Sequence, residues 1–140
     1  MAEASSSESL ENLRKVPLFA DLSEDSLARI ADTSTVFEAS TGHVLVQPRK
    51  AGAGLFVIEE GSVTVELQGR KLELGPGEFF GELALLRKDE THTARVCAAS
   101  PCRLLAIRRD DFDGLLETEP HLAVSMLKVL AERLAAGDRA

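Results

Sequence analysis

The sequence has no tryptophan and no tyrosine, and its six aromatic residues are all phenylalanine. They are spread over apolar, core-like positions, which leaves little surface for stacking nucleic-acid bases. Positive charge is also in deficit, because 16 lysine and arginine residues stand against 23 aspartate and glutamate residues, giving a formal net charge of −7. An acidic surface repels phosphate backbones, so general binding of DNA or RNA is disfavoured.

Cysteine and histidine are scarce as well. Cys97 and Cys102 flank a Ser-Pro turn, and two cysteines alone form neither a disulfide framework nor a zinc site, so we expect two buried thiols of a reducing compartment. His43, His92 and His121 include no His-x-His pair, which disfavours a metal-dependent jelly-roll enzyme. No Gly-x-Ser-x-Gly elbow and no P-loop occurs either. The sequence therefore predicts a protein that is not an enzyme, with no catalytic residues and no metal site.

Long apolar runs are absent too. No stretch approaches the ~18 apolar residues that span a membrane. Residues 1–8 have neither the basic region nor the apolar region of a signal peptide. We therefore expect a cytoplasmic protein with no membrane segment in this chain. The 140 residues suit one domain, and we predict a tail over residues 1–8, a domain over 9–136 and a tail over 137–140.

The order of the periodic segments predicts a mainly β fold with helices at both ends. Apolar residues recur at helical spacing over residues 10–16, and Ser23 is a good N-cap for a second helix. About eight short strands with glycine turns follow, the clearest being the alternation of apolar and polar residues over 63–67. Residues 78–90 break this rhythm and suggest one helical turn. The whole pattern predicts an antiparallel eight-stranded jelly-roll β-barrel.

Two further helices are predicted after the strands, as a C-terminal hinge or lid. Asp110 is the expected N-cap of a short helix to Glu117. Pro120 can open a last helix, which would continue to about Ala136. Five apolar positions of that helix are expected on one face, namely Ala123, Met126, Val129, Leu130 and Leu134.

A series of glycine-containing motifs carries the most specific pattern. Together these motifs resemble the cyclic-nucleotide-binding domain family, which includes catabolite activator proteins and the regulatory subunits of cAMP-dependent kinase. The resemblance covers roughly residues 10–135, and its most specific part, residues 80–85, resembles the phosphate-binding cassette. The motifs are, in order, Gly42-x-Val44-Leu45, Phe56-x-Ile58-x-x-Gly61-x-Val63-x-Val65 and Gly75-x-Gly77-x-x-Phe80-Gly81-Glu82-Leu83-Ala84-Leu85.

The resemblance implies a ligand site for cAMP or cGMP in the segment from residue 79 to residue 96, and it implies no other cofactor. The start of a short helix offers backbone N–H groups to a cyclic phosphate, and Gly81 permits close backbone approach. Leu83 and Ala84 would present such N–H groups, and Glu82 would accept a hydrogen bond from the ribose 2′-hydroxyl. The alternative for Glu82 is a solvated carboxylate beside a turn.

The second half of the cassette departs from the family pattern. The family usually reads Pro-Arg-Ala/Ser/Thr-Ala-x-Val, and its arginine holds the phosphate with two hydrogen bonds. Aligned back from Val96, His92 stands in the arginine position. Loss of a charged bidentate contact could weaken binding by ~1.5–3 kcal/mol. Thr93 fills the next position, where a hydroxyl can touch phosphate or a guanine edge, a faint indication of cGMP.

Three interpretations of His92 stay open. It is a phosphate donor that works best when protonated, or it marks a degenerate pocket that binds another ligand or none. In the third, it is an ordinary strand residue, and Arg87, Lys88 or Arg95 supplies the positive charge. The implied ligand-binding residues are Phe80, Gly81, Glu82, Leu83, Ala84, His92, Thr93 and Arg95.

These features predict a regulatory sensor whose C-terminal helices repack over the bound nucleotide. Its partners would be the cyclic nucleotide and an effector domain or protein. The alternative is a degenerate cyclic-nucleotide-binding-like module used for protein interaction or dimerisation. In that case the exposed part of the last helix, with Lys128, Glu132 and Arg133, would pair with a second copy of the chain.

Overall fold

The strands of the protein form two antiparallel sheets. The computed structural model describes residues 11–47, 54–67, 69–81 and 94–136. The strands are β1 (Ser34–Ala39), β2 (Val44–Val46), β3 (Gly54–Glu60), β4 (Val63–Leu67), β5 (Arg70–Leu74), β6 (Phe79–Phe80), β7 (Arg95–Ala98) and β8 (Cys102–Arg108). One sheet has the order β1-β8-β3-β6 and the other has the order β2-β7-β4-β5.

The sheets correct one part of the predicted fold. A mainly β fold with flanking helices is confirmed, but within the described ranges no strand pairing joins one sheet to the other, so a closed barrel is not seen. Two of the edge strands, β2 and β6, have only three and two residues. Such short strands offer few backbone groups for pairing with a further strand.

The space between the two sheets is filled by an apolar cluster, which we call the inter-sheet core. The alternation predicted over residues 63–67 is confirmed, because Val63, Val65 and Leu67 are buried and the residues between them are not. The fully buried members Ile58 and Leu104 come from the central strands of the other sheet. Both sheets therefore contribute alternate side chains to one core.

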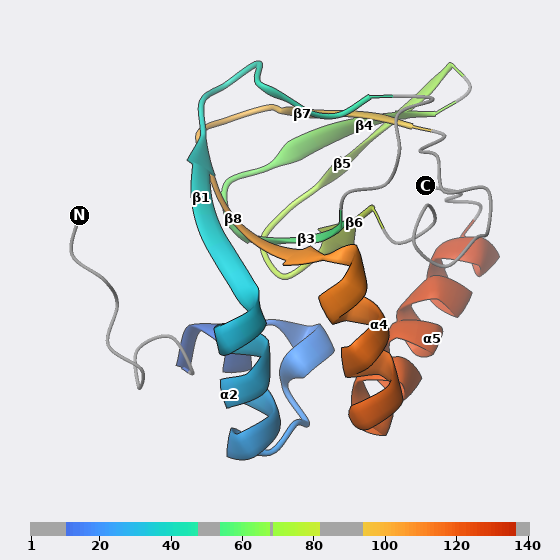
Figure 1. Ribbon diagram of the computed structural model, residues 1–140. Coiled ribbons are helices and arrows are strands. Elements are labelled where there is room, and N and C mark those ends of the chain that lie inside the picture. Colours follow the sequence, from blue (N-terminus) through green and yellow to red (C-terminus); the bar gives the residue numbers. More distant parts are fainter. Residues whose placement is uncertain (1–10, 48–53, 68, 82–93, 137–140) are drawn as a thin grey trace.

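The helices cover the outer face of the β1-β8-β3-β6 sheet, as Figure 1 shows. Side chains of this face and of the helices form a second cluster, which we call the helix-side core. Residues 11–14 are helical, and the later helices are η1 (Pro17–Phe19), α2 (Glu24–Thr33), α4 (Arg109–Thr118) and α5 (Pro120–Ala135). Among the described helices, none has the length and apolar character needed to cross a membrane.

The starts of two helices test the capping predictions. Ser23 caps α2 as expected, because its side chain accepts a hydrogen bond from the backbone N–H of Ser26. The prediction that Asp110 caps α4 is wrong, since the N-cap is Arg108 and the helix begins at Arg109. Strand β8 continues directly into this helix, so Asp110 and Asp111 lie in its first turn. There their negative charge interacts favourably with the helix dipole.

One side of α5 packs on the sheet, and it is largely the side that the sequence predicted, because Met126 is buried and Val129 and Leu130 pack against the helix-side core. Leu122 and Met126 are buried in the helix-side core. Leu134, expected on the same face, is 64% exposed, so that expectation is wrong. Arg133 faces the sheet instead and contacts β6. The last turn of α5 therefore has a polar contact where an apolar one was predicted.

Candidate functional site

Strand β6 opens the segment in which the ligand site is expected. Its two phenylalanines are almost fully buried and point to opposite faces of the sheet, Phe79 into the helix-side core and Phe80 into the inter-sheet core. The strand pairs with β3 through Phe56↔Phe80 and Val57↔Phe79. Residues 78–90 were expected to interrupt the series of strands, but Phe79 and Phe80 form a short strand there. Two residues are too few to show an alternating pattern.

Aromatic rings line the inter-sheet side of β6. The rings of Phe80 and Phe56 are stacked, with centroids 5.1 Å apart and an interplanar angle of 14°. Phe37 of β1 meets Phe56 edge-on at 6.0 Å. Phe37 and Phe56 are only partly buried, unlike Phe80. A cluster of aromatic side chains therefore lies beside the start of the expected cassette. Aromatic rings of this kind pack favourably against other flat rings.

Gly81 follows β6 in a conformation that requires glycine. Its φ of +92° lies in the left-handed region, and a Cβ atom there would lie 2.7 Å from the carbonyl oxygen of Gly54. The close approach seen at Gly81 is to the backbone of β3, whereas its expected approach to a phosphate stays a prediction. This contact fixes the backbone position of the last described residue before the gap at residues 82–93.

Most of the predicted ligand residues lie outside the described residues. These are Glu82, Leu83, Ala84, His92 and Thr93, and their roles stay predictions. Among the alternative cations, Arg87 and Lys88 also lie outside the described residues, whereas Arg95 is described.

Arg95 lies on the outer face of the other sheet. Its neighbours Ala94 and Val96 belong to the inter-sheet core, whereas the Arg95 side chain is 47% exposed. Its Nη1 lies 3.3 Å from Oε1 of Glu66, which is directly opposite on β4. The structure therefore brings Phe80 and Gly81 together at β6 but directs Arg95 to the opposite side of its strand. Ligand binding by Arg95 stays a prediction and would compete with Glu66.

Arg133 lies near the site, in a position that differs from the one predicted for it. It was expected on the exposed part of α5, but its Nη2 donates a hydrogen bond of 2.7 Å to the Phe79 carbonyl oxygen. Its guanidinium carbon lies 4.3 Å from the centroid of the Phe79 ring, a cation–π contact. A signal was available, because Arg133 follows Leu122 and Met126 at spacings that keep it on the same helix face. The C-terminal helix therefore touches the strand that leads into the cassette.

The cysteines and the acidic residues form no second centre in the described part of the chain. Cys102 is buried as expected and Cys97 is only partly buried, and both are free thiols. No group of three or more histidine, cysteine or acidic side chains suited to a metal ion occurs among the residues described. A cleft of about 340 Å³ lies between residues 12–16 and the turn at Pro76 and Gly77. None of the predicted ligand residues lines this cleft.

Comparison with known proteins places these features in a family. The family profile described as "Cyclic nucleotide-binding domain" matches residues 36–119. A cyclic nucleotide-gated potassium channel of Rhizobium etli is 36% identical over 84% of this chain and 33% of its own length. A cGMP-dependent protein kinase of Caenorhabditis briggsae is 37% identical over 74% of this chain and 15% of its own length. The chain thus spans a third or less of these two relatives.

A solved structure supports the same family fold. The catabolite activator protein of Thermus thermophilus superposes with a TM-score of 0.73 and 29% identity, over 87% of this chain and 60% of that chain. The matched profile covers both sheets together with helix α4, and it includes the β6 strand and Gly81. The chain therefore belongs to the cyclic nucleotide-binding domain family.

Proposed function

We propose that this chain is a regulatory domain of a cytoplasmic protein, not an enzyme, that senses cAMP or cGMP. The nucleotide would bind between the cassette that begins at Phe80 and the two sheets, which we regard as the halves of a jelly roll. The relatives include a channel and a kinase that are several times longer than this chain. We therefore propose that the output passes to an effector domain or protein.

Gly81 is the observation that supports the proposal most directly. A left-handed glycine lies against the Gly54 carbonyl at the second residue of the cassette. Backbone N–H groups that follow such a residue at a helix start favour an anionic ligand. The adjacent ring of Phe56, which stacks on Phe80 and is only partly buried, offers apolar surface for the rest of a nucleotide.

The proposed roles of the cassette residues follow from their chemistry. Leu83 and Ala84 donate backbone N–H groups to the cyclic phosphate, and Glu82 accepts a hydrogen bond from the ribose 2′-hydroxyl. His92 takes the position of the usual arginine and donates to the phosphate when it is protonated, while Thr93 donates its hydroxyl. Since Arg95 is paired with Glu66, we assign it a smaller share of the binding.

Calorimetric titration with cAMP and with cGMP at pH 6 and pH 8 tests this function. We expect saturable binding that is stronger at pH 6, because only the imidazolium form of His92 brings a positive charge to the phosphate. Equal affinity at the two pH values would indicate that a residue other than His92 contacts the phosphate. No binding of either nucleotide at millimolar concentration would overturn the proposed function.

Two substitutions with matched controls test the individual roles. Glu82→Ala should lower nucleotide affinity, whereas Glu73→Ala, an exposed carboxylate on β5, should not. His92→Arg should raise nucleotide affinity, because a guanidinium group can make two hydrogen bonds to the phosphate. His43→Arg, on an exposed turn, should not raise it. Weaker binding by the His92→Arg variant would contradict the alignment of this part of the chain.

A second candidate function is a dimerisation module, and the outer face of α5 favours it. Val124, Leu127, Ala131 and Leu134 are exposed and follow one another at spacings of three or four residues. They form an apolar stripe on the side of the helix away from Leu122 and Met126. Such a stripe is the pattern by which one helix pairs with another of the same kind.

The occupant that we propose for this stripe is α5 of a second copy of the chain. Sedimentation equilibrium should then show a dimer without nucleotide, and Leu127→Lys should return it to a monomer. Lys71→Ala, an exposed cation on β5 in the other sheet, is the matched control. A monomer at high micromolar concentration would exclude the module in this form.

A further inference from the structure

The cleft beside residues 12–16 is a pocket that the candidate nucleotide site does not use. Its volume of about 340 Å³ is at the lower end of the range for small-molecule pockets, ~300–1,000 Å³. It lies at the end of β3 that carries Glu59 and Glu60, whereas Gly54, at the other end, lies against Gly81. Glu59 comes five positions after Gly54, about 17 Å along a strand. The cleft is therefore separate from the start of the cassette.

A β-bulge at the end of β3 places two carboxylates on the cleft. Ile58 and Glu60 pair with two consecutive residues of β8, so Glu59 is an extra residue without an opposite partner. Adjacent side chains of a regular strand point to opposite faces, and a bulge interrupts this alternation. Both Glu59 and Glu60 accordingly line the cleft.

The first of these carboxylates is paired within the cleft. Glu59 is only 11% exposed, and its Oε1 accepts a hydrogen bond of 3.2 Å from Nε of Arg103, which also lines the cleft. This pair holds the guanidinium group of Arg103 in one place. Arg103 makes no further hydrogen bond within the described part of the chain, so its two Nη groups can donate to a ligand.

The other two charged side chains of the cleft are Lys15 and Glu60, and both are exposed. Neither forms an ion pair with any residue that the structure describes, and they form none with each other. Two opposite charges that line one cleft without meeting leave room for a molecule that carries both charges.

One wall of the cleft is fixed to the sheet before any ligand enters. The N–H of Gly77 donates to the Ile58 carbonyl of β3 at 2.7 Å. Gly77 has a φ of +88°, and a Cβ atom there would lie 2.9 Å from Cδ of Pro17, so the turn packs tightly against the N-terminal segment. A pocket with such a prepared wall needs little ordering when it binds a ligand.

We infer that this cleft binds a small zwitterion whose carboxylate and ammonium groups are joined by a short apolar chain. Lys15 binds the carboxylate, with the Arg103 Nη groups and the Asn12 amide as further donors. Glu60 binds the ammonium group, and the ring of Pro76 packs on the methylene groups between the two charges. The cleft is lined by two cationic and two anionic side chains, so a neutral ligand with separated charges suits it better than an anion or a cation.

NMR titration of the isotope-labelled full chain, without nucleotide, tests this site. The probes are glycine, γ-aminobutyrate and ε-aminocaproate, in which the carboxylate and the ammonium group lie progressively further apart. Hexanoate and hexylamine carry one charge each and serve as control ligands. We expect saturable amide shifts centred on residues 12–16, 59–60 and 77–78 with at least one zwitterion, and roughly tenfold weaker binding of both control ligands. No saturable shift with any zwitterion would overturn the inference, and so would equal affinity for a control ligand.

Exchange of the two unpaired charges tests the residues that bind the ligand. Lys15→Glu and Glu60→Lys should each weaken binding of the best probe by roughly tenfold. Both side chains are exposed, so the fold should be retained. The variant with both changes should recover part of the affinity, because the zwitterion can bind in the reverse direction. Lys71→Glu and Glu73→Lys, on exposed positions of β5, are the matched controls and should leave binding unchanged. A double variant as weak as the single ones would overturn the assignment.

The inference does not rest on the proposed function. The titration of the cleft uses no nucleotide, and its reporter amides belong to the cleft. Absence of cAMP or cGMP binding would therefore count against the proposed function only. A cleft that binds no zwitterion would count against this inference only.

Discussion

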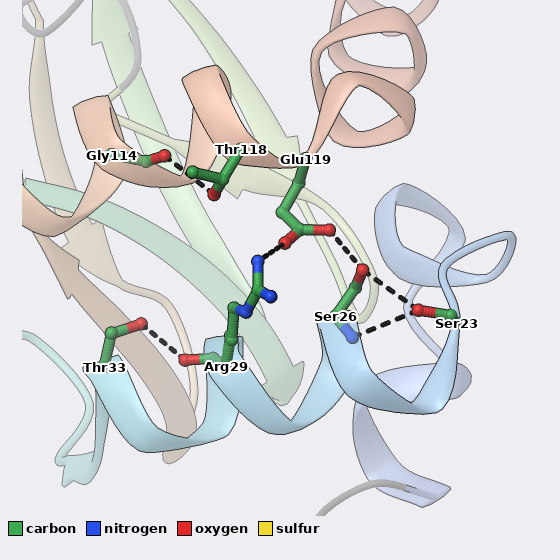
Figure 2. Close-up of polar contacts among 7 residues, drawn as sticks. All are labelled: Ser23, Ser26, Arg29, Thr33, Gly114, Thr118 and Glu119. Atoms are coloured by element: carbon green, nitrogen blue, oxygen red, sulfur yellow. Dashed lines mark hydrogen bonds and ion pairs between the residues drawn. The ribbon is translucent and has the colours of Figure 1, made fainter.

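The inter-sheet core and the helix layer differ in how their contacts are made. Between the sheets, the buried residues described are all apolar, and the polarizable Cys102 thiol donates only to backbone carbonyl groups. In the helix layer, the structure includes the buried Glu119 with Ser26 and Arg29 (Figure 2), and the contact of Arg133 with Phe79. A close-packed apolar core has few alternative arrangements. Directional polar contacts can break and form again one at a time.

This difference indicates which part of the domain can move. The inter-sheet core fixes the position of Phe80, directly before Gly81. Phe79, the neighbour of Phe80, belongs to the other core and holds Arg133. Strand β6 therefore contributes one phenylalanine to each core, and the phenylalanine on the helix side also contacts a charged side chain. A conformational change caused by a ligand would therefore pass to the helices that pack on the helix-side core.

The largest expected effect comes from cavities in the two cores. Leu104→Ala in the inter-sheet core should lower the free energy of unfolding by ~2–5 kcal/mol, and Phe112→Ala in the helix-side core by ~3–5 kcal/mol. Both side chains are fully buried. Urea unfolding measures the losses, and hydrogen exchange shows where each begins. If Phe112→Ala loosens both sheets as strongly as the helices, the two layers do not differ in the way we describe.

Gly81→Ala should have the next largest effect, because it combines two costs. The left-handed φ disfavours alanine, and the new Cβ would meet the Gly54 carbonyl oxygen at 2.7 Å. We expect a loss of about 3 kcal/mol together with loss of nucleotide binding. Gly69→Ala is the matched control, since its φ is +79° but nothing lies within 4 Å of the added atom. Its loss should be near ~1 kcal/mol. Equal losses would show that the Gly54 contact is unimportant.

The two partners of the buried ion pair should respond unequally. Arg29 is 59% exposed, whereas Glu119 is 6% exposed. Arg29→Met leaves a buried carboxylate with only Ser26, which should cost ~1.5–3 kcal/mol, the range for a hydrogen bond to a charged group. Glu119→Gln leaves Arg29 free to turn to water and should cost less than about 1.5 kcal/mol. Chemical denaturation of both variants measures the difference, and the reverse order would contradict the burial that we describe.

The sequence predicted the regular parts of the fold and missed the contacts between distant parts. Alternation over 63–67 and the N-cap at Ser23 are local patterns, and the structure confirms both. Glu119 looks like an ordinary acidic residue between two helices, because its partners lie 93 and 90 positions earlier in the chain. Strand β6 has two residues, too few for any periodic signal. The expected ligand residues were recognised through the family pattern, since a turn that cradles an anion has no hydrophobic period.

The smallest expected effect concerns the exposed ion pair of Arg95 and Glu66, which contrasts with the buried pair at Glu119. Both side chains are more than 40% exposed, at 47% and 43%, and the closest atoms are 3.3 Å apart. Water and salt screen such pairs, so Arg95→Ala should change the free energy of unfolding by less than about 1 kcal/mol. Nucleotide affinity should change little as well, because Arg95 points away from the inter-sheet core. Urea unfolding and calorimetry of the one variant measure both quantities. A large loss of affinity with unchanged stability would mean that Arg95 leaves Glu66 to hold the phosphate, and His92 would then lose that role.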